Sequence, residues 1–254
     1  MSLEFRILLA GGTTDGRRVT QELLEHGYSV LWSQATDVPF ALPDHPKLAC
    51  RSGPLTATGF AELARIERID AFVDVGHPHA EGLHEALRAA SVQTGLPLFR
   101  FARSAMTFEP WVTQVHSHEE AARLAFGLRR NVFLTIGTRH LEPYVTEANT
   151  SVQEFALRVL DCAESRLRVQ ALGLRGPVLF ARGPFSLDDN LRDFDRFDAD
   201  VIVTKDSGPE GGLAAKLSAA RALGCEVIVV ERPAEPCDAY HSVSDLLLAL
   251  RRLR

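Results

Sequence analysis

The sequence predicts an α/β fold made of two doubly wound parallel sheets. Apolar runs of strand length alternate with helix-period segments, and the runs are nearly continuous, as expected for parallel strands that helices cover on both faces. Two of these runs break into polar, glycine-rich turns that lead into helices, one near each end of the chain. We therefore expect two Rossmann-like domains that face one cleft, covering residues 1–108 and 109–254.

The first domain is expected to alternate between strands and helices. Its expected strands lie at residues 5–10, 28–32, 71–75 and 96–101, with a further short strand just before Arg51. Its expected helices lie at residues 14–26, 57–68 and 80–93. Between residues 103 and 118 no helical period is visible, and Pro110 disfavours helix at the residue before it. This stretch is expected to be a crossover.

The second domain is expected to repeat the α/β plan. Its expected strands lie at residues 132–136, 155–160, 178–181 and 226–230. Its expected helices lie at residues 118–128 and 242–253, with a helical turn after Gly137 and a strand, loop and helix over residues 200–223. The Leu and Ala stripe of the last helix is expected to pack against a core rather than to bind a ligand.

Composition and charge favour a small-molecule partner. The chain of 254 residues has a net charge of −5, so an anionic ligand must be held by local Arg and Lys clusters rather than by a global attraction. The four cysteines form no CxxC pair, which favours reduced thiols over disulfides or a zinc site. Neither a secretion signal nor an apolar run near the roughly 20 residues of a membrane span is visible, so we expect a soluble, cytoplasmic protein.

The first glycine turn, Gly11-Gly12-Thr13-Thr14, follows the first expected strand. It combines close backbone approach, two hydroxyls and a helix N-terminus at the position where dinucleotide-binding folds hold a pyrophosphate. The alternative is a tight turn in which Thr13 or Thr14 only caps the helix. We favour phosphate binding because the turn follows the first strand.

The end of the second strand carries no acid. In folds that bind NAD, an acidic residue there takes the ribose hydroxyls, whereas this strand ends at Ser33 and no acid follows until Asp37. The position therefore tolerates a 2'-phosphate, and Arg51 and Ser52 lie where they would reach it. A solvated surface pair is the alternative interpretation of these two residues.

Two pairs of histidines stand out. His77 and His79 follow an expected strand, at the end where open α/β sheets bind ligands. A His-x-His pair ligates metals in some hydrolases, but such sites need further His and carboxylate ligands, and no matching set follows the later strands, so we expect no metal. His116 and His118 lie in the crossover and are expected to mark a helix entry with solvent-facing imidazoles.

Four cations follow expected strands of the second domain. Arg139 and Arg182 each follow a strand, Lys205 opens the second glycine turn at residues 204–212, and Lys216 lies in the helix after it. Guanidinium groups suit planar carboxylates and phosphates. The set predicts a local basic cleft, although each cation alone also fits a surface ion pair. The sequence contains no Ser-His-Asp nucleophile elbow and no Walker A loop.

Several segments, taken together, are specific enough to indicate a protein family. They are residues 8–13, 77–80, 98–100, 133–137, 182–185 and 203–208, with Lys216, Arg221, Arg232 and Pro233. With these segments the chain resembles the precorrin-6A reductase family of corrin biosynthesis over nearly its whole length. The family usually has Thr where this chain has Gly76 and Asn where it has Asp206. These departures concern hydrogen bonds in the site rather than the fold.

The resemblance implies reduction of one double bond of the precorrin-6A macrocycle by hydride from NADPH, giving precorrin-6B on the route to vitamin B12. The cofactor carries this chemistry, while the protein orients it and binds the carboxylates of the tetrapyrrole. The residues expected to bind the cofactor are Gly11, Gly12, Thr13, Thr14, Ser33, Arg51, Lys205, Asp206, Ser207, Gly211 and Gly212. Those expected to bind the substrate are His77, Arg100, Arg139 and Arg182. His77 and Lys216 are the expected catalytic residues.

Other functions remain open at this point. A reductase of cobalt-precorrin-6A that uses NADH would share the fold and the site. The absence of an acidic residue at the end of the second strand favours NADPH. A non-catalytic dinucleotide sensor would bind the cofactor without oxidising it, but guanidinium groups gathered at strand ends argue against it. A metal hydrolase is the third alternative. We expect no nucleic-acid or membrane partner, and contact with neighbouring pathway enzymes stays open.

Overall fold

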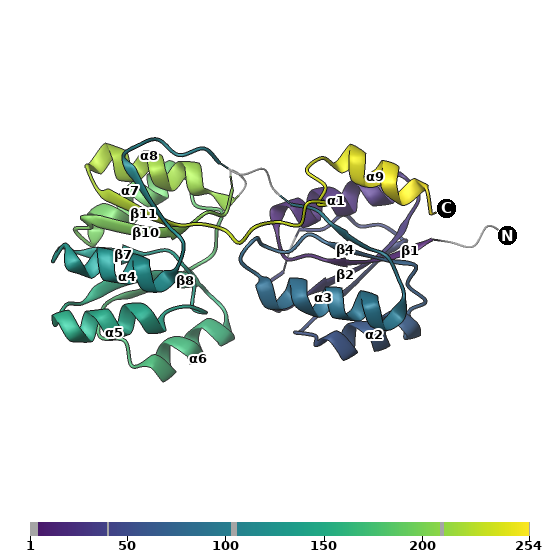
Figure 1. The fold of residues 1–254 in the computed structure, drawn as a ribbon, viewed down its shortest axis with the longest axis horizontal. Coiled ribbons are helices and arrows are strands. Elements are labelled where there is room, and N and C mark those ends of the chain that lie inside the picture. The colour runs from purple at the N-terminus through teal and green to yellow at the C-terminus, as the bar shows by residue number, and fades with distance from the viewer. Residues whose placement is uncertain (1–4, 40, 103–105, 209–210, 254) are drawn as a thin grey trace. The chain divides into compact units, whose positions relative to one another are not determined.

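The protein is described by a computed structural model that covers residues 5–39, 41–102, 106–208 and 211–253. The chain divides into two compact units (Figure 1). Unit 1 comprises Met1–Ser104 and Pro233–Arg254, and unit 2 comprises Ala105–Arg232. Residues 103–105 of the expected crossover, and Pro209 and Glu210 of the second glycine turn, lie outside the described residues.

Unit 1 contains a five-stranded parallel sheet in the order β3-β2-β1-β4-β5. The strands are β1 (Arg6–Ala10), β2 (Ser29–Gln34), β3 (Leu48–Ser52), β4 (Ala71–Asp74) and β5 (Leu98–Arg100). The helices are α1 (Thr14–Glu25), α2 (Ala57–Ile66), α3 (Glu81–Thr94) and α9 (Val243–Arg251). The doubly wound α/β plan predicted for this part of the chain is confirmed.

The C-terminal helix belongs to unit 1. Leu246 and Leu250 of α9 lie in the same buried cluster as Val19 and Leu23 of α1, and the two helices lie side by side (Figure 1). The packing role expected for α9 is confirmed. Its placement in a second domain of residues 109–254 needs correction, because a leucine stripe shows that a helix covers a core but not which core.

Unit 2 contains a six-stranded parallel sheet in the order β6-β11-β10-β7-β8-β9. The strands are β6 (Val112–Val115), β7 (Val132–Leu134), β8 (Phe155–Leu160), β9 (Val178–Ala181), β10 (Val201–Lys205) and β11 (Glu226–Val230). The helices are α4 (His118–Gly127), α5 (Glu142–Ser151), α6 (Ala163–Leu172), α7 (Leu187–Arg196) and α8 (Leu213–Leu223). This unit is a second doubly wound α/β domain.

Three elements of unit 2 were not expected from the sequence. β6 lies inside the expected crossover and pairs with β11 at the edge of the sheet, with only Val112 and Val115 of its four residues buried. α6 buries only Ser165. The buried residues of α7 are Asn190, Asp193 and Phe194, of which two are polar. β6 and α6 have no apolar stripe that would reveal them, whereas α7 carries Leu187, Leu191 and Phe194 at helical spacing and was missed despite this signal.

All four cysteines are free thiols; Cys50 and Cys237 are exposed, and Cys225 is buried. Across the part of the chain that the structure describes, no helix has the length and hydropathy needed to cross a membrane.

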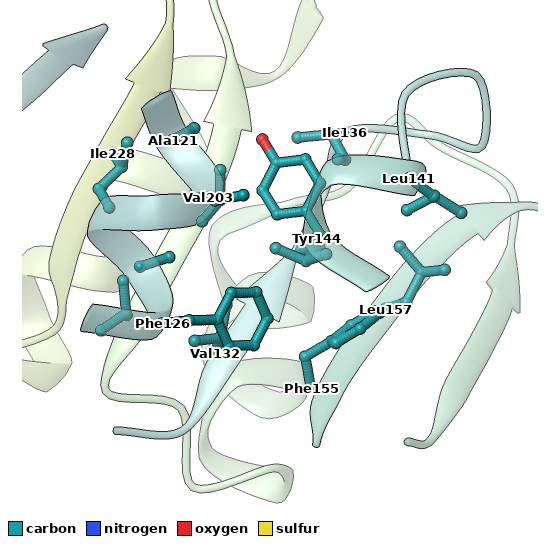
Figure 2. Close-up of a cluster of buried hydrophobic side chains, with 14 of the residues drawn as sticks. Ala121, Phe126, Val132, Ile136, Leu141, Tyr144, Phe155, Leu157, Val203 and Ile228 are labelled. Atoms are coloured by element: carbon teal, nitrogen blue, oxygen red, sulfur yellow. The ribbon is translucent and has the colours of Figure 1, made fainter. Parts of the chain in front are cut away.

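A hydrophobic cluster of unit 2 surrounds Tyr144 of α5 (Figure 2). The ring of Tyr144 is fully buried, and its neighbours in the cluster include Phe126 and Leu157. Burial, and next the negative charge of Glu119, raise the pKa of Tyr144, so the phenol stays neutral. Its hydroxyl lies 2.9 Å from Nδ1 of His118.

The His118 imidazole is buried. The sequence-based expectation that it faces solvent is therefore wrong. The expected helix entry is confirmed, because Ser117 caps α4 by accepting the N–H of Glu120. His116 is exposed, as expected. An N-cap pattern locates the start of a helix, but the tertiary fold decides which of its first side chains reaches the core.

We expect two substitutions of Tyr144 to separate packing from hydrogen bonding. Tyr144→Phe keeps the ring and loses the hydroxyl, so the free energy of unfolding should fall by about 1 kcal/mol. Tyr144→Ala also leaves a cavity, and the fall should be about 3–5 kcal/mol. Urea unfolding followed by circular dichroism measures both. Equal losses in the two variants would contradict the packing role of the ring.

Candidate functional site

In unit 1 the chain leaves β1 and β4 in opposite directions. β1 continues through α1 to β2, and β4 continues through α3 to β5 on the other side of the sheet. Open α/β sheets bind ligands outside the carboxyl ends of their strands at such a switch point. The loops after β1 and β4 therefore mark the candidate site of this unit.

The loop after β1 is a tight turn built against the indole of Trp32. Gly11 donates its N–H to the carbonyl of Ser33 at 2.9 Å. A Cβ atom at Gly11 would lie 2.5 Å from the Trp32 ring. Gly12 has φ = 92°, in the left-handed region that favours glycine. The shape of the turn requires both glycines, and their missing side chains leave the backbone accessible to a ligand.

Thr13 sets the start of α1. Its hydroxyl accepts the N–H of Gly16 at 3.0 Å and donates to the carbonyl of Val75, in the loop after β4, at 2.9 Å. The capping role considered for Thr13 is confirmed, and the helix begins at Thr14. Capping and anion binding are compatible, because the first turn of a helix has several free N–H groups and the positive end of the dipole.

Arg51 and Ser33 meet at the ends of β3 and β2. Arg51 donates from Nη1 to Ser33 Oγ at 2.8 Å and from Nη2 to the carbonyl of Ser52 at 2.8 Å. Partial burial lowers the pKa of Arg51, but a guanidinium stays charged at neutral pH. A cation and a hydroxyl therefore stand where NAD-binding folds carry an acid.

His77 follows β4 and is half-buried. Its Nδ1 accepts the N–H of His79 at 3.2 Å, which leaves Nε2 as the donor of the ring. The His77 and His79 rings lie 5.6 Å apart. Within the described ranges, no group of three or more His, Cys, Asp or Glu residues is arranged to hold a metal ion.

Arg100 is buried at the end of β5 and uses its donors inside unit 1. It donates to both oxygens of Glu235 at 2.9 and 2.8 Å, to Asp74 Oδ1 at 3.2 Å and to the carbonyl of Gly76 at 3.1 Å. These contacts differ from the substrate contact expected for Arg100. A buried guanidinium must be neutralised, and here protein carboxylates do so.

Unit 2 has its own switch point, between the adjacent strands β7 and β10. β7 continues through α5 to β8, whereas β10 continues through α8 to β11 in the opposite direction. Arg139 lies exposed in the loop after β7, and Lys205 ends β10. Arg182 is exposed after β9, at the edge of the same sheet. Arg139 and Lys205 are thus at the switch point, and Arg182 is farther along the carboxyl edge.

Two lysines beside this switch point have lowered pKa values. Burial, with the nearby charges of Arg158 and Lys205, lowers the pKa of Lys216 to about 7. Burial and the charge of Arg139 lower the pKa of Lys205 to about 8. Lys216 Nζ donates to Thr204 Oγ1 at 3.4 Å. Desolvated cations near one another are stabilised by an anionic ligand, so this cluster is a candidate anion site.

Asp206 is buried in the loop after β10. Arg232 donates to its two oxygens at 2.6 and 2.7 Å, and the N–H of Gly208 donates to one of them at 3.1 Å. Asp206 was expected to bind the cofactor. In the structure its carboxylate holds the loop, because a buried carboxylate needs charged or N–H partners.

The rest of this loop leads into α8. Ser207 is buried, and its hydroxyl donates to the carbonyl of Gly211 at 3.3 Å. Gly212 has φ = 72° and is the N-cap of α8. Ser207, Gly211 and Gly212 therefore lie together at a helix N-terminus, as the glycine turn predicted.

Arg158 was not predicted from the sequence. It is buried in β8 and donates to Asp193 and Asn190 of α7, each at 2.7 Å. Its guanidinium also lies 3.8 Å from the centre of the Phe185 ring. Arg158 thus packs against the turn after β9 and links it to α7. An arginine inside an apolar strand was the available signal, because such a residue is rarely buried without a specific partner.

Known proteins share this organisation. Residues 6–251 match the family described as precorrin-6x reductase CbiJ/CobK. The chain is 32% identical over 252 residues to the precorrin-6A reductase of Rhodococcus erythropolis, with 96% of each chain covered. It is 29% identical over 231 residues to the cobalt-precorrin-6A reductase of Priestia megaterium, with 89% of this chain and 90% of the relative covered.

A solved structure agrees with the sequence relatives. The structure of CobK precorrin-6A reductase superposes with a TM-score of 0.80 at 27% identity, and the match covers 99% of this chain and 98% of the other. The sequence match and the structural match both extend over nearly the entire chain. This chain therefore belongs to the precorrin-6x reductase CbiJ/CobK family.

Proposed function

We propose that this chain reduces precorrin-6A to precorrin-6B with NADPH. The observation that carries the proposal is membership of the precorrin-6x reductase family over residues 6–251. NADPH, when bound, supplies a hydride to one carbon of a double bond of the macrocycle. A proton adds to the other carbon, and NADP⁺ is the oxidised product. The protein has to bind the anionic groups of both molecules, orient them and supply or admit that proton.

The switch point of unit 1 fits the phosphates of NADPH. We assign the pyrophosphate to the first glycine turn and the start of α1, and the 2'-phosphate to the pair at the ends of β2 and β3. The residues concerned are Gly11, Gly12, Thr13 and Thr14 for the first group, and Ser33 and Arg51 for the second. The guanidinium of Arg51 supports NADPH over NADH, because its positive charge and its N–H donors suit the 2'-phosphate that only NADPH carries.

The cations of unit 2 fit further anionic groups. We assign Lys205, Ser207, Gly211 and Gly212 to the cofactor. Arg139 and Arg182, together with His77 of unit 1, are assigned to the carboxylates of the tetrapyrrole. Arg100 and Asp206 are left out of both sets, because their charges are already paired inside their own units.

Lys216 is the proposed proton donor, and His77 is proposed to orient the substrate. Nδ1 of His77 accepts an N–H, so the ring offers Nε2–H as a hydrogen-bond donor. Lys216, with a pKa of about 7, exists in both protonation states near neutral pH. A group that titrates near the working pH transfers protons efficiently, which supports a catalytic role for Lys216.

A cobalt-containing substrate is the second candidate. It is favoured by the similarity to a relative named as a cobalt-precorrin-6A reductase. Fold and site would be the same, so only the substrate and the cofactor distinguish the two candidates.

The test is anaerobic incubation of the purified chain with metal-free precorrin-6A and NADPH, following cofactor oxidation and the visible spectrum of the macrocycle together. Coupled loss of NADPH and a shortened chromophore supports the proposal. Cofactor binding without oxidation contradicts it, and repetition with cobalt-precorrin-6A and NADH then tests the second candidate.

Arg51→Gln should weaken NADPH binding selectively. Loss of a charge-assisted contact with the 2'-phosphate costs about 1.5–3 kcal/mol, so the Kd for NADPH should rise about 10- to 100-fold. The Kd for NADH, which lacks that phosphate, should not change. Fluorescence titration measures both, and Lys47→Gln, which removes a positive charge just before the opposite end of β3, is the matched control. An equal rise in the Kd for NADPH and the Kd for NADH would count against the assignment.

The pH dependence of turnover should follow Lys216. As pH rises through about 7, Lys216 loses its proton. If it donates the proton, kcat/KM should fall on the alkaline side. Lys216→Gln should lower kcat about 100-fold or more and abolish that limb of the profile. An unchanged alkaline limb in the variant would exclude Lys216 as its source.

The same residue has a separate effect on stability. Its pKa is lower in the folded chain than its ordinary value of 10.5, so the unfolded chain binds more protons between these two values. The contribution of Lys216 to the free energy of unfolding should therefore rise with pH across that window. Comparison of wild type and Lys216→Gln by urea unfolding at several pH values measures it.

A further inference from the structure

The backbone carbonyls at the end of β4 and in the loop after it are held by donors from elsewhere in unit 1. The carbonyl of Val75 accepts from Thr13, and that of Gly76 accepts from Arg100. The carbonyl of His77 accepts from Nε2 of His84 at 3.0 Å. Side chains from three other elements or loops, those of Thr13, Arg100 and His84, thus hold the segment that carries His77.

His84 lies in the first turns of α3 and is buried. Its Nδ1 is 2.7 Å from Asp74 Oδ2, and its Nε2 faces the carbonyl of His77. A carbonyl oxygen can only accept, so Nε2 must carry a hydrogen. A carboxylate can also only accept, so Nδ1 must carry one as well, provided that Asp74 is ionised.

Asp74 has the partners of an ionised carboxylate. Its Oδ1 accepts the N–H of Gly76 at 2.9 Å and Nη1 of Arg100 at 3.2 Å. Burial opposes ionisation, but the hydrogen bond from His84, the charge of Arg100 and the N–H of Gly76 hold the pKa of Asp74 below its ordinary value. Both ring nitrogens of His84 therefore face acceptors.

The charges of the group balance only if His84 is protonated. Asp74 and Glu235 supply two negative charges, and Arg100 supplies one positive charge. A neutral His84 would leave a buried group with a net negative charge, which is costly. A pocket of about 160 Å³ adjoins the group, and its other charged lining residues are Glu81, Arg88 and Asp238.

We propose that His84 is a positioning residue that acts as an imidazolium. It joins the Asp74 carboxylate to the carbonyl of His77 and so sets where the His77 ring lies. The effect on turnover rests on the proposed function, whereas the protonation state of His84 does not.

The protonation state is tested by nitrogen NMR of the histidine rings in uniformly ¹⁵N-labelled protein at neutral pH, with the His84 signals assigned by their loss in His84→Gln. We expect hydrogens on both ring nitrogens of His84. In Asp74→Asn, where the carboxylate charge is removed, one of these hydrogens should be lost. An unprotonated ring nitrogen at His84 in the wild type overturns the proposal.

The positioning role is tested by steady-state kinetics of His84→Gln. Glutamine cannot donate to both acceptors, so His77 should shift and kcat should fall about 10- to 100-fold. KM for NADPH should stay unchanged, because the glycine turn and Arg51 are untouched. His116→Gln is the matched control: His116 also faces a carboxylate, Glu231 at 2.8 Å, but its side chain is 84% exposed. This control should keep wild-type kcat.

Each outcome decides the role of His84. A folded His84→Gln with wild-type kcat, or an equal loss in His116→Gln, overturns the positioning role. If His84→Gln does not fold, as judged by circular dichroism, Asp74→Asn replaces it and should show the same fall in kcat. If the wild type does not reduce precorrin-6A, the proposed function fails, while the NMR result on the wild type still decides whether His84 is an imidazolium.

Discussion

In both units an aspartate at the end of a central strand is paired with an arginine, and the pair holds the loop that follows. Asp74 ends β4 and pairs with Arg100. Asp206 follows β10 and pairs with Arg232. Each carboxylate also accepts the backbone N–H two residues further along. A buried carboxylate is tolerated only when such partners replace water, so each loop is held in the conformation that satisfies its aspartate.

This arrangement explains how an acidic chain offers anion sites. The net charge is −5. At the two switch points, however, the aspartates are paired with arginines. Arg51, Lys205 and Lys216 lie in or beside the loops without a bonded carboxylate partner among their described contacts. Local pairing, rather than total charge, decides what these edges bind.

Regular periodicity made most of the fold predictable. Buried parallel strands read as apolar runs, so nearly every central strand could be located from the sequence. β6 could not, because a four-residue edge strand with two exposed residues has no such run. α7 has Leu187, Leu191 and Phe194 at helical spacing and could have been located, but the pairing of its Asn190 and Asp193 with an arginine from another element has no local signal.

The candidate site was predictable in position but not in every role. Strand-end motifs and the family resemblance pointed to Gly11, Thr13 and Lys205, which lie at switch points. Arg100 shows the limit of this reasoning, because its partner Glu235 is 135 residues away in the sequence. No local pattern reveals such a pair, so a buried structural arginine and a ligand-binding arginine look alike in a sequence.

The division of the chain has a consequence for its synthesis. Unit 2 is one continuous segment, Ala105–Arg232, whereas unit 1 is completed only by Pro233–Arg254. Domains usually form in N-terminal order as a ribosome releases them. Here the leucines of α9 that fill the core beside α1 are synthesised after the whole of unit 2. The strands of unit 1 must therefore wait for a segment that follows unit 2 in the chain before their core is complete.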